Sequence, residues 1–239
     1  MEGLLAPVNR ATERTLAHNG YVLQAAPGQR CCGALHAHAG DRASAQALAR
    51  ANIAAFEASG ADFVAVNSAG CGAAMKGYAH LFAGDTAWHD RAARFSGRVR
   101  DVSELLADAG PAPARSVTAG TVAVDHPCHL IHGQRVTEAP ARVLRAMEGL
   151  NAADLPDAAT CCGSAGLYSL AQPDLSQRVL APKLEAIVAS GATTVVTGNP
   201  GCMMHIGAGL IRAGHAVAVR HPVELLDDAY SRTDVPVTT

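Results

Sequence analysis

Apolar and polar positions along this chain follow two different periodicities. In residues 6–18, 43–58 and 174–189, apolar side chains recur every three or four positions, as they do in an amphipathic helix. Between such stretches lie short β-branched runs that end in Gly-rich turns, a pattern typical of buried strands. Helices that alternate with short strands predict an α/β fold with parallel sheets. In such folds the functional loops gather at the carboxyl ends of the strands.

The chain contains an internal repeat. Residues 58–71 (ASGADFVAVNSAGC) and 189–202 (ASGATTVVTGNPGC) align without a gap and are identical at seven of fourteen positions. Each segment shows a helix end, a glycine, a short strand and a Gly-rich turn that ends in cysteine. We therefore expect two tandem homologous α/β units, residues 1–112 and 113–239. The stretch GPAPARS at residues 110–116 is the predicted linker between them.

All seven cysteines belong to this repeat. The first unit holds Cys31, Cys32 and Cys71, and the second holds Cys128, Cys161, Cys162 and Cys202. Each adjacent pair is followed by a glycine, and the next cysteine lies 39 or 40 positions further on. Thiolates are the usual ligands of iron–sulfur clusters, so the pattern predicts a metal centre. We expect one [4Fe–4S] cluster on the four thiolates of the second unit.

The second unit opens with a strand that the first unit does not have. Cys128 follows this predicted strand and precedes Cys161 by 33 positions, whereas the same step back from Cys31 falls before Met1. The first unit is therefore expected to lack its leading strand and its leading cysteine. A cluster on its three thiols would need an outside ligand, a nearby histidine or a sulfur-deficient form.

Glycines and histidines near the cysteines are further candidates for the site. The glycines expected to approach a bound cluster closely, with amides that hydrogen-bond to it, are Gly33, Gly72, Gly163 and Gly201. His36, His126 and His129 lie close to cysteines in the sequence. Such histidines serve as hydrogen-bond donors or loop residues more often than as ligands, and the sequence leaves their roles open.

Composition narrows the class of protein. A net charge of −2 without a basic stripe argues against nucleic-acid binding, and the short apolar runs predict no membrane span. The N-terminus lacks the pattern of a signal peptide, which predicts a cytoplasmic protein. In that compartment cysteine patterns indicate metal or redox chemistry more often than disulfides. Two alternatives stay open: a zinc-stabilised interaction subunit without redox activity, and buried structural thiols.

Four motifs resemble a known family. They are CCGALHAHAG at residues 31–40, HPCHLIHGQ at 126–134, CCGSAGLYSLAQPDLSQ at 161–177 and GNPGCMMHI at 198–206. Together they resemble the two cysteine-rich CCG domains of the glycolate oxidase (glycolate dehydrogenase) iron–sulfur subunit, and the similarity runs from about Ala6 to Leu226. Lactate-utilisation iron–sulfur subunits and the catalytic subunit of heterodisulfide reductase are related chains.

The resemblance implies an electron-transfer subunit of an oxidoreductase that is not active alone. Its implied partner is an FAD-containing subunit that oxidises a 2-hydroxy acid, from which electrons pass toward a quinone at the inner face of the membrane or to another acceptor. The family's subunit normally also has a ferredoxin-like domain with two four-cysteine clusters, and no such cysteine run occurs here. Ser68 and Asn199 replace the first cysteine of a fuller Cys-x-x-Cys motif, which disfavours heterodisulfide reductase chemistry.

Overall fold

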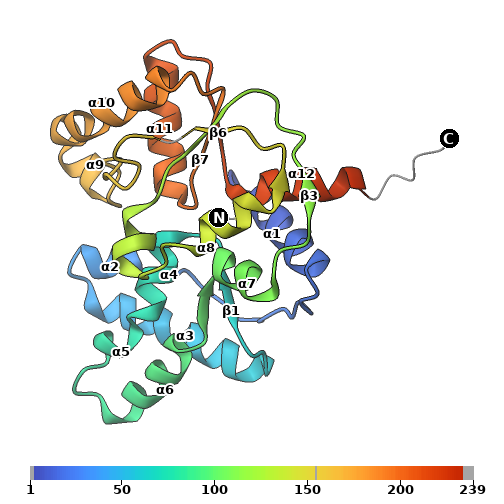
Figure 1. The fold of residues 1–239 in the computed structure, drawn as a ribbon. Helices are drawn as coiled ribbons and strands as arrows, with labels where there is room; N and C mark the ends of the chain where they lie inside the picture. The colour runs from blue at the N-terminus through green and yellow to red at the C-terminus, as the bar shows by residue number, and fades with distance from the viewer. Residues whose placement is uncertain (1–2, 154, 234–239) are drawn as a thin grey trace.

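The computed structural model describes residues 3–153 and 155–233 as an α/β chain with two units (Figure 1). The first unit consists of α1 (Ala6–His18), α2 (Ala34–His38), α3 (Arg42–Ser59), β1 (Val64–Val66), α4 (Ala69–Lys76), α5 (Tyr78–Leu81), α6 (Thr86–Ser96), β2 (Val99–Asp101) and α7 (Val102–Ala109). The second consists of β3 (Ala114–Arg115), β4 (Val122–Val124), the π-helical turn η1 (His129–Gly133), α8 (Ala139–Arg145), β5 (Met147–Glu148), β6 (Ala152–Ala153), α9 (Tyr168–Ala171), α10 (Pro173–Ala189), β7 (Thr194–Val196), α11 (Pro200–Arg212), β8 (Ala218–Arg220) and α12 (Pro222–Thr233). None of the described helices is both long and apolar enough to cross a membrane.

All strand pairs in the described chain are parallel, as the sequence predicts. The second unit has a four-stranded sheet in the order β6-β4-β7-β8, and the first has a two-stranded sheet, β1-β2. A third pair, β3-β5, forms because part of the predicted linker is extended: the Ala114 amide donates to the Ala146 carbonyl at 3.2 Å. The segment between the units is therefore held in a short sheet.

The two sheets differ by two strands, because β4 and β6 have no counterparts paired with β1 in the described part of the first unit. In the second unit β7 lies between β4 and β8, whereas in the described part of the first unit β1 pairs with β2 alone. All three residues of β7 are buried, but Ala65 in the middle of β1 is exposed. One edge of β1 is consequently open.

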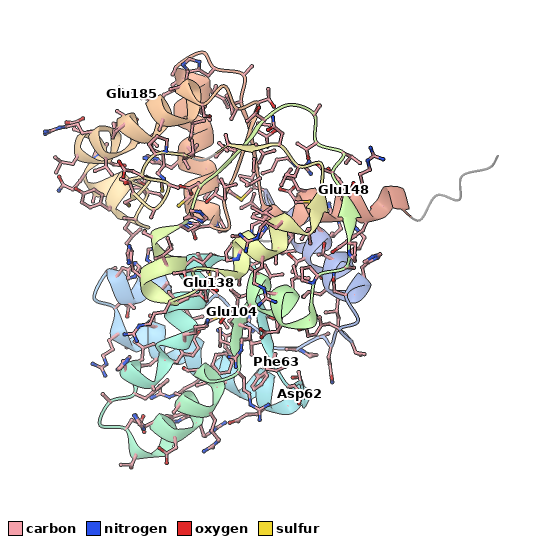
Figure 2. All side chains as sticks on the ribbon, in the orientation of Figure 1. Asp62, Phe63, Glu104, Glu138, Glu148 and Glu185 are labelled. Atoms are coloured by element: carbon pink, nitrogen blue, oxygen red, sulfur yellow. The ribbon has the colours of Figure 1, made fainter. Side chains whose placement is uncertain are left out.

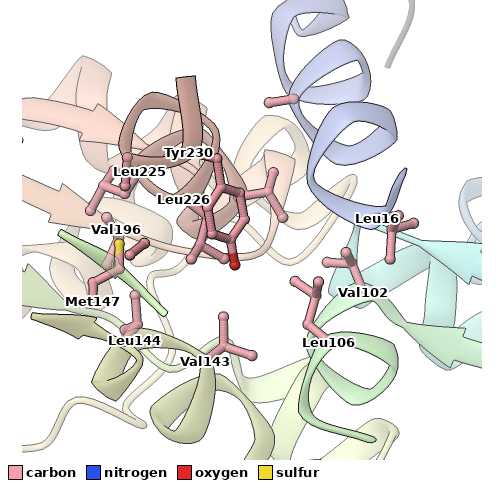
Figure 3. Packing of buried hydrophobic residues seen from close by; sticks show 14 of the residues in the cluster. Leu16, Val102, Leu106, Val143, Leu144, Met147, Val196, Leu225, Leu226 and Tyr230 are labelled. Atoms are coloured by element: carbon pink, nitrogen blue, oxygen red, sulfur yellow. The ribbon is translucent and has the colours of Figure 1, made fainter. Parts of the chain in front are cut away.

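The two units share a hydrophobic core. Helices α1 and α7 of the first unit pack with α8 and α12 of the second (Figure 3). Leu16, Leu106, Leu225 and Leu226 are all buried in this core. Full burial of such a side chain contributes about 1.5–3 kcal/mol. These contacts fix the orientation of the two units and bring the carboxyl ends of their strands to one interface.

Helices α7 and α12 begin in the same way in both units. The Glu104 carboxylate accepts from the Asp101 amide at 2.8 Å, and the Glu224 carboxylate accepts from the His221 amide at 2.7 Å. Asp101 and His221 are buried, so burial disfavours the charged form of each. It raises the pKa of Asp101 to about 6 and lowers the pKa of His221 to about 4.

We predict that Asp101→Asn stabilises the fold at pH 8. The pKa of Asp101 rises from 3.8 to about 6 on folding. The stability that its protonated form contributes is therefore fully present below about pH 4 and is lost as pH rises through 6. This change corresponds to about 3 kcal/mol. The gain from Asp101→Asn, measured by denaturant unfolding, should therefore shrink from pH 8 to pH 5. Asp108→Asn, on the exposed side of the same helix, should show no such trend. An Asp101→Asn gain that is constant with pH would contradict the prediction.

Candidate metal centre

Three separate segments bring four thiols together in the second unit. Cys128 follows β4, Cys161 and Cys162 occupy the turn before α9, and Cys202 lies in the first turn of α11. The Cys162 and Cys202 sulfurs are 3.0 Å apart, and the Cys128 and Cys162 thiols lower the pKa of the neighbouring Cys161. The four thiols thus gather at the carboxyl ends of β4 and β7.

Negative charge in this group is concentrated on one sulfur. Hydrogen bonds from Cys128 and Cys162, together with the Gly163 amide at 3.3 Å, lower the pKa of Cys161. The same thiol–thiol contacts and burial raise the pKa values of Cys128 and Cys162, which keep their protons. Four neighbouring cysteine side chains, one with a lowered pKa, form a donor set that suits a soft metal centre.

The first unit brings together fewer thiols. Cys32 is hydrogen-bonded to Cys71, in the first turn of α4, while Cys31 is exposed. The bond from Cys32 and a further one from Ser68 lower the pKa of Cys71 to about 6. Burial and the contact with Cys71 raise the pKa of Cys32. The first unit therefore has three cysteines near this position, one fewer than the second unit.

The glycine after each cysteine pair is required by the backbone. Gly163 has φ +84°, and a Cβ there would lie 2.5 Å from the Ser176 carbonyl oxygen in α10. Gly33 has φ +77°, and its Cβ would lie 3.2 Å from Ala45 Cα in α3. Both glycines adopt left-handed backbone conformations at points where the chain packs closely against the following helix. The shared geometry explains why the Cys-Cys-Gly sequence occurs twice.

The other two predicted glycines occupy close packing positions. A Cβ on Gly72 would lie 2.4 Å from Gln134 Nε2, and one on Gly201 would lie 2.9 Å from Ser164 Oγ. Gly163 is the predicted glycine whose amide reaches a thiol, at Cys161. That the amides of Gly33, Gly72 and Gly201 hydrogen-bond to a cluster stays a prediction.

The three histidines are placed differently. His129 Nδ1 lies 3.8 Å from the Cys128 sulfur. His36 pairs with Asp41 at 3.1 Å on the surface, and the His126 amide donates to the Ala158 carbonyl. His129 is thus the histidine of these three whose ring contacts a cysteine of the site.

A buried ion pair ties together the segments that carry the thiols. Lys183 of α10 binds the Asp125 carboxylate and donates to the Ala158 carbonyl at 3.0 Å, while Thr197 donates to Asp125 at 2.6 Å. Asp125 precedes Cys128, Ala158 precedes Cys161, and Thr197 precedes Cys202. Sequence reasoning missed this network. Its one available signal was that the helix of residues 174–189 carries one of the chain's two lysines.

Asn199 connects the two cysteine sites. Its amide nitrogen donates to the Cys202 sulfur at 3.3 Å, and its amide oxygen accepts from the Gly70 amide at 3.1 Å, next to Cys71. The Ala69 amide also donates to the Gly198 carbonyl at 3.0 Å. The first turns of α4 and α11, with their cysteines, therefore meet at the interface between the units.

The donor set of the second unit fits an iron–sulfur cluster, for which thiolates are the usual ligands. Within residues 3–153 and 155–233, no three His, Cys, Asp or Glu side chains converge on one point where a single ion would lie. A [4Fe–4S] cluster is held by four cysteine thiolates, and this unit offers four thiols on three segments. Ligation would replace the present thiol–thiol hydrogen bonds.

We predict that Gly163→Ala destabilises the protein more than Gly33→Ala. Both variants pay about 1–2 kcal/mol for a left-handed alanine. The Gly163 variant also meets the Ser176 carbonyl, which belongs to a helix backbone and cannot move aside cheaply. Gly149→Ala is the control, because Gly149 has φ +76° with open space around its Cβ position. Equal unfolding free energies for Gly163→Ala and Gly149→Ala would show that the close approach is not a constraint.

We predict that Lys183→Met costs more stability than Lys183→Met combined with Asp125→Asn. The single change leaves a buried carboxylate without its cation, which costs about 3–5 kcal/mol, whereas the double change removes both charges. Denaturant unfolding of the metal-free protein at pH 7 measures both variants. A double variant that is no more stable than the single one would mean that the ion pair does not tie these segments together.

The comparisons with known proteins agree with this geometry. The family model "Cysteine-rich domain" (CCG) matches residues 2–76 and 122–207. The chain is 36% identical over 233 residues to a Bacillus subtilis protein named probable glycolate oxidase iron-sulfur subunit, with 96% of this chain and 52% of that protein covered. The Escherichia coli glycolate oxidase iron-sulfur subunit is 32% identical over 242 residues, which cover 97% and 58%. Lactate utilization protein A of Exiguobacterium is 28% identical over 226 residues, which cover 94% and 92%.

The chain spans about half the length of the glycolate oxidase subunits that it matches. The two matched segments contain all seven cysteines, and each ends a few residues after the cysteine in the first turn of α4 or α11. The motifs, the repeated fold and the family model therefore agree, and this chain belongs to the cysteine-rich CCG domain family.

Proposed function

We propose that this chain is the iron–sulfur electron-transfer subunit of a 2-hydroxy-acid dehydrogenase. The observation that carries the proposal is the group of four contacting thiols of Cys128, Cys161, Cys162 and Cys202. A [4Fe–4S] cluster on these thiolates would accept and pass on single electrons. The chain's own residues hold the ligands in place through Lys183 and donate to their sulfurs from Gly163 and Asn199.

Donors to sulfur adjust the electron affinity of such a centre. The Gly163 amide and the Asn199 side chain both donate to thiol sulfurs at 3.3 Å. Hydrogen bonds of this kind stabilise the more negative, reduced form and raise the reduction potential. Asn199, at a position where a fuller motif has cysteine, thus acts as a donor to Cys202 and not as a ligand.

The electron donor is proposed to be an FAD-containing subunit that oxidises a 2-hydroxy acid, and the acceptor a quinone or another carrier. The names of the relatives support this class of substrate. Glycolate is favoured by the higher identity, 36% against 28%, and lactate by the similar length, because the chain covers 92% of the lactate utilization protein. Reduction of the cluster by the flavoprotein partner, with glycolate or with lactate as substrate, decides between them.

We predict about four iron atoms per chain after anaerobic purification, with a [4Fe–4S] signal in the electron paramagnetic resonance spectrum of the reduced protein. Cys161→Ser should abolish both, because Cys161 lies in the middle of the thiol chain. Cys31→Ser is the matched control from the first cysteine pair, and it should keep the iron.

Two outcomes would contradict the proposal. Stoichiometric zinc without iron would select a zinc-stabilised interaction subunit. Iron lost in Cys31→Ser but kept in Cys161→Ser would place the cluster in the first unit, against the count of thiols.

A further inference from the structure

A buried serine joins the cysteine turn of the second unit to a histidine on the neighbouring helix. Ser176 of α10 is fully buried, and its hydroxyl donates to the Gly163 carbonyl at 2.8 Å. The same hydroxyl oxygen lies 3.0 Å from His205 Nε2 on α11. Ser176 has a single hydroxyl proton, so the His205 ring is the donor of this second hydrogen bond. The order of donation is therefore from His205 to Ser176 and from Ser176 to Gly163.

This series of donors continues to one of the four thiols. The Gly163 carbonyl and the Ser164 amide belong to the same peptide group. The contact with Cys161, followed by those with Cys202 and burial, raises the pKa of Cys162. The Ser164 amide acts against this rise, because it donates toward the Cys162 sulfur. We call His205, Ser176 and the peptide group between Gly163 and Ser164 the relay.

The relay lies on the inner side of α10. Glu185, nine positions after Ser176 and so on the opposite face of the helix, is exposed to solvent (Figure 2). Ser164 and Ser176 are buried and His205 is half-buried. Away from water, a hydrogen bond accepted by a carbonyl polarises its peptide group and strengthens the bond that the amide of that group donates. The side chains of Ser176 and His205 therefore act on Cys162 through the backbone.

The first unit has the same turn without the relay. Gly33 packs against Ala45 of α3 in the way that Gly163 packs against Ser176 of α10. Alanine has no hydroxyl to donate, and the Gly33 carbonyl instead accepts from the Ala37 amide at 3.0 Å. The Cys-Cys-Gly turn thus forms without a serine at this place. The relay is a feature of the turn that has four thiols around it.

We propose that His205 and Ser176 are positioning residues for the metal centre, which hold and polarise the Ser164 amide against the Cys162 sulfur. The inference rests on the proposed function, in which a cluster is bound by the four thiolates. A donor to a ligand sulfur stabilises the more negative, reduced form of such a centre and raises its reduction potential. Loss of either side chain weakens that donor without removing a ligand.

The first test measures the reduction potential of the iron-loaded protein at pH 8. His205 is neutral there, because burial lowers its pKa from the usual 6.5. Ser176→Ala should reduce the equilibrium constant for one-electron reduction about threefold, which makes the potential about 28 mV more negative. His205→Met should shift the potential in the same direction. His205→Gln should restore most of it, since the glutamine side chain can still donate to Ser176.

The control variant is Ser190→Ala at the end of the same helix. Its hydroxyl also donates to a backbone carbonyl, that of Ile187, at 2.6 Å. The change therefore removes a similar hydrogen bond from α10 outside the relay. Ser190→Ala should leave the reduction potential unchanged.

The second test needs no metal. In the iron-free, reduced protein, nuclear magnetic resonance follows the amide proton of Ser164. A weaker hydrogen bond moves an amide proton upfield, so Ser176→Ala and His205→Met should both shift this resonance upfield. His205→Gln should shift it less, and Ser190→Ala should leave it in place.

Three results would overturn the proposal. The potentials of Ser176→Ala and His205→Met could equal that of the unmodified protein, or Ser190→Ala could shift the potential as much as they do. The Ser164 resonance could also stay in place in both relay variants. A chain that binds no iron would contradict the proposed function instead, and the Ser164 resonance would still decide whether the relay acts on this amide.

Discussion

The buried pair of Lys183 and Asp125 determines how the metal centre is assembled. One lysine on α10 contacts the ends of two segments that carry thiols, and Thr197 brings the third into the same network through the Asp125 carboxylate. Burying two charges costs several kcal/mol of desolvation, so such a pair adds little net stability and acts chiefly on geometry. The observed arrangement of β4, β7 and the cysteine turn satisfies both charges. The thiols therefore meet before any cluster is bound.

The two units differ in the polar groups that surround their cysteines. The turn after the cysteine pair is retained in both, with glycines at φ +77° and +84° against the next helix. The polar network is not retained. In the repeat, Asn52 stands in the place of Lys183 and Val66 in that of Thr197. Without an aspartate to pair with, a lysine at position 52 would be a buried charge with no counterion. The neutral asparagine instead accepts from the Arg30 amide and donates to the Cys31 carbonyl.

The sequence was sufficient to predict the features that depend on local patterns or on the internal repeat. The spacing of the cysteines and the parallel strands place thiols at strand ends, and the count back from Cys31 predicts an incomplete first sheet. It did not predict the ion pair of Lys183 and Asp125, because these residues are 58 positions apart and a lone helical lysine is normally exposed. It also missed the shared core, since the pairing of α1 with α12 depends on how the units pack and not on either helix alone. Helix α8 ends at Arg145 because Met147 and Glu148 pair with β3.

The meeting of the two units has a consequence for both sites. Asn199 bonds at once to Cys202 and to the Gly70 amide beside Cys71, so the first turns of α4 and α11 cannot shift independently. The shared core of α1, α7, α8 and α12 holds the same interface from the other side. A shift of the first turn of α4 would therefore act on the side chain that donates to Cys202. The incomplete unit is thus positioned to affect the hydrogen bonding of the complete site, although it contributes none of that site's thiols.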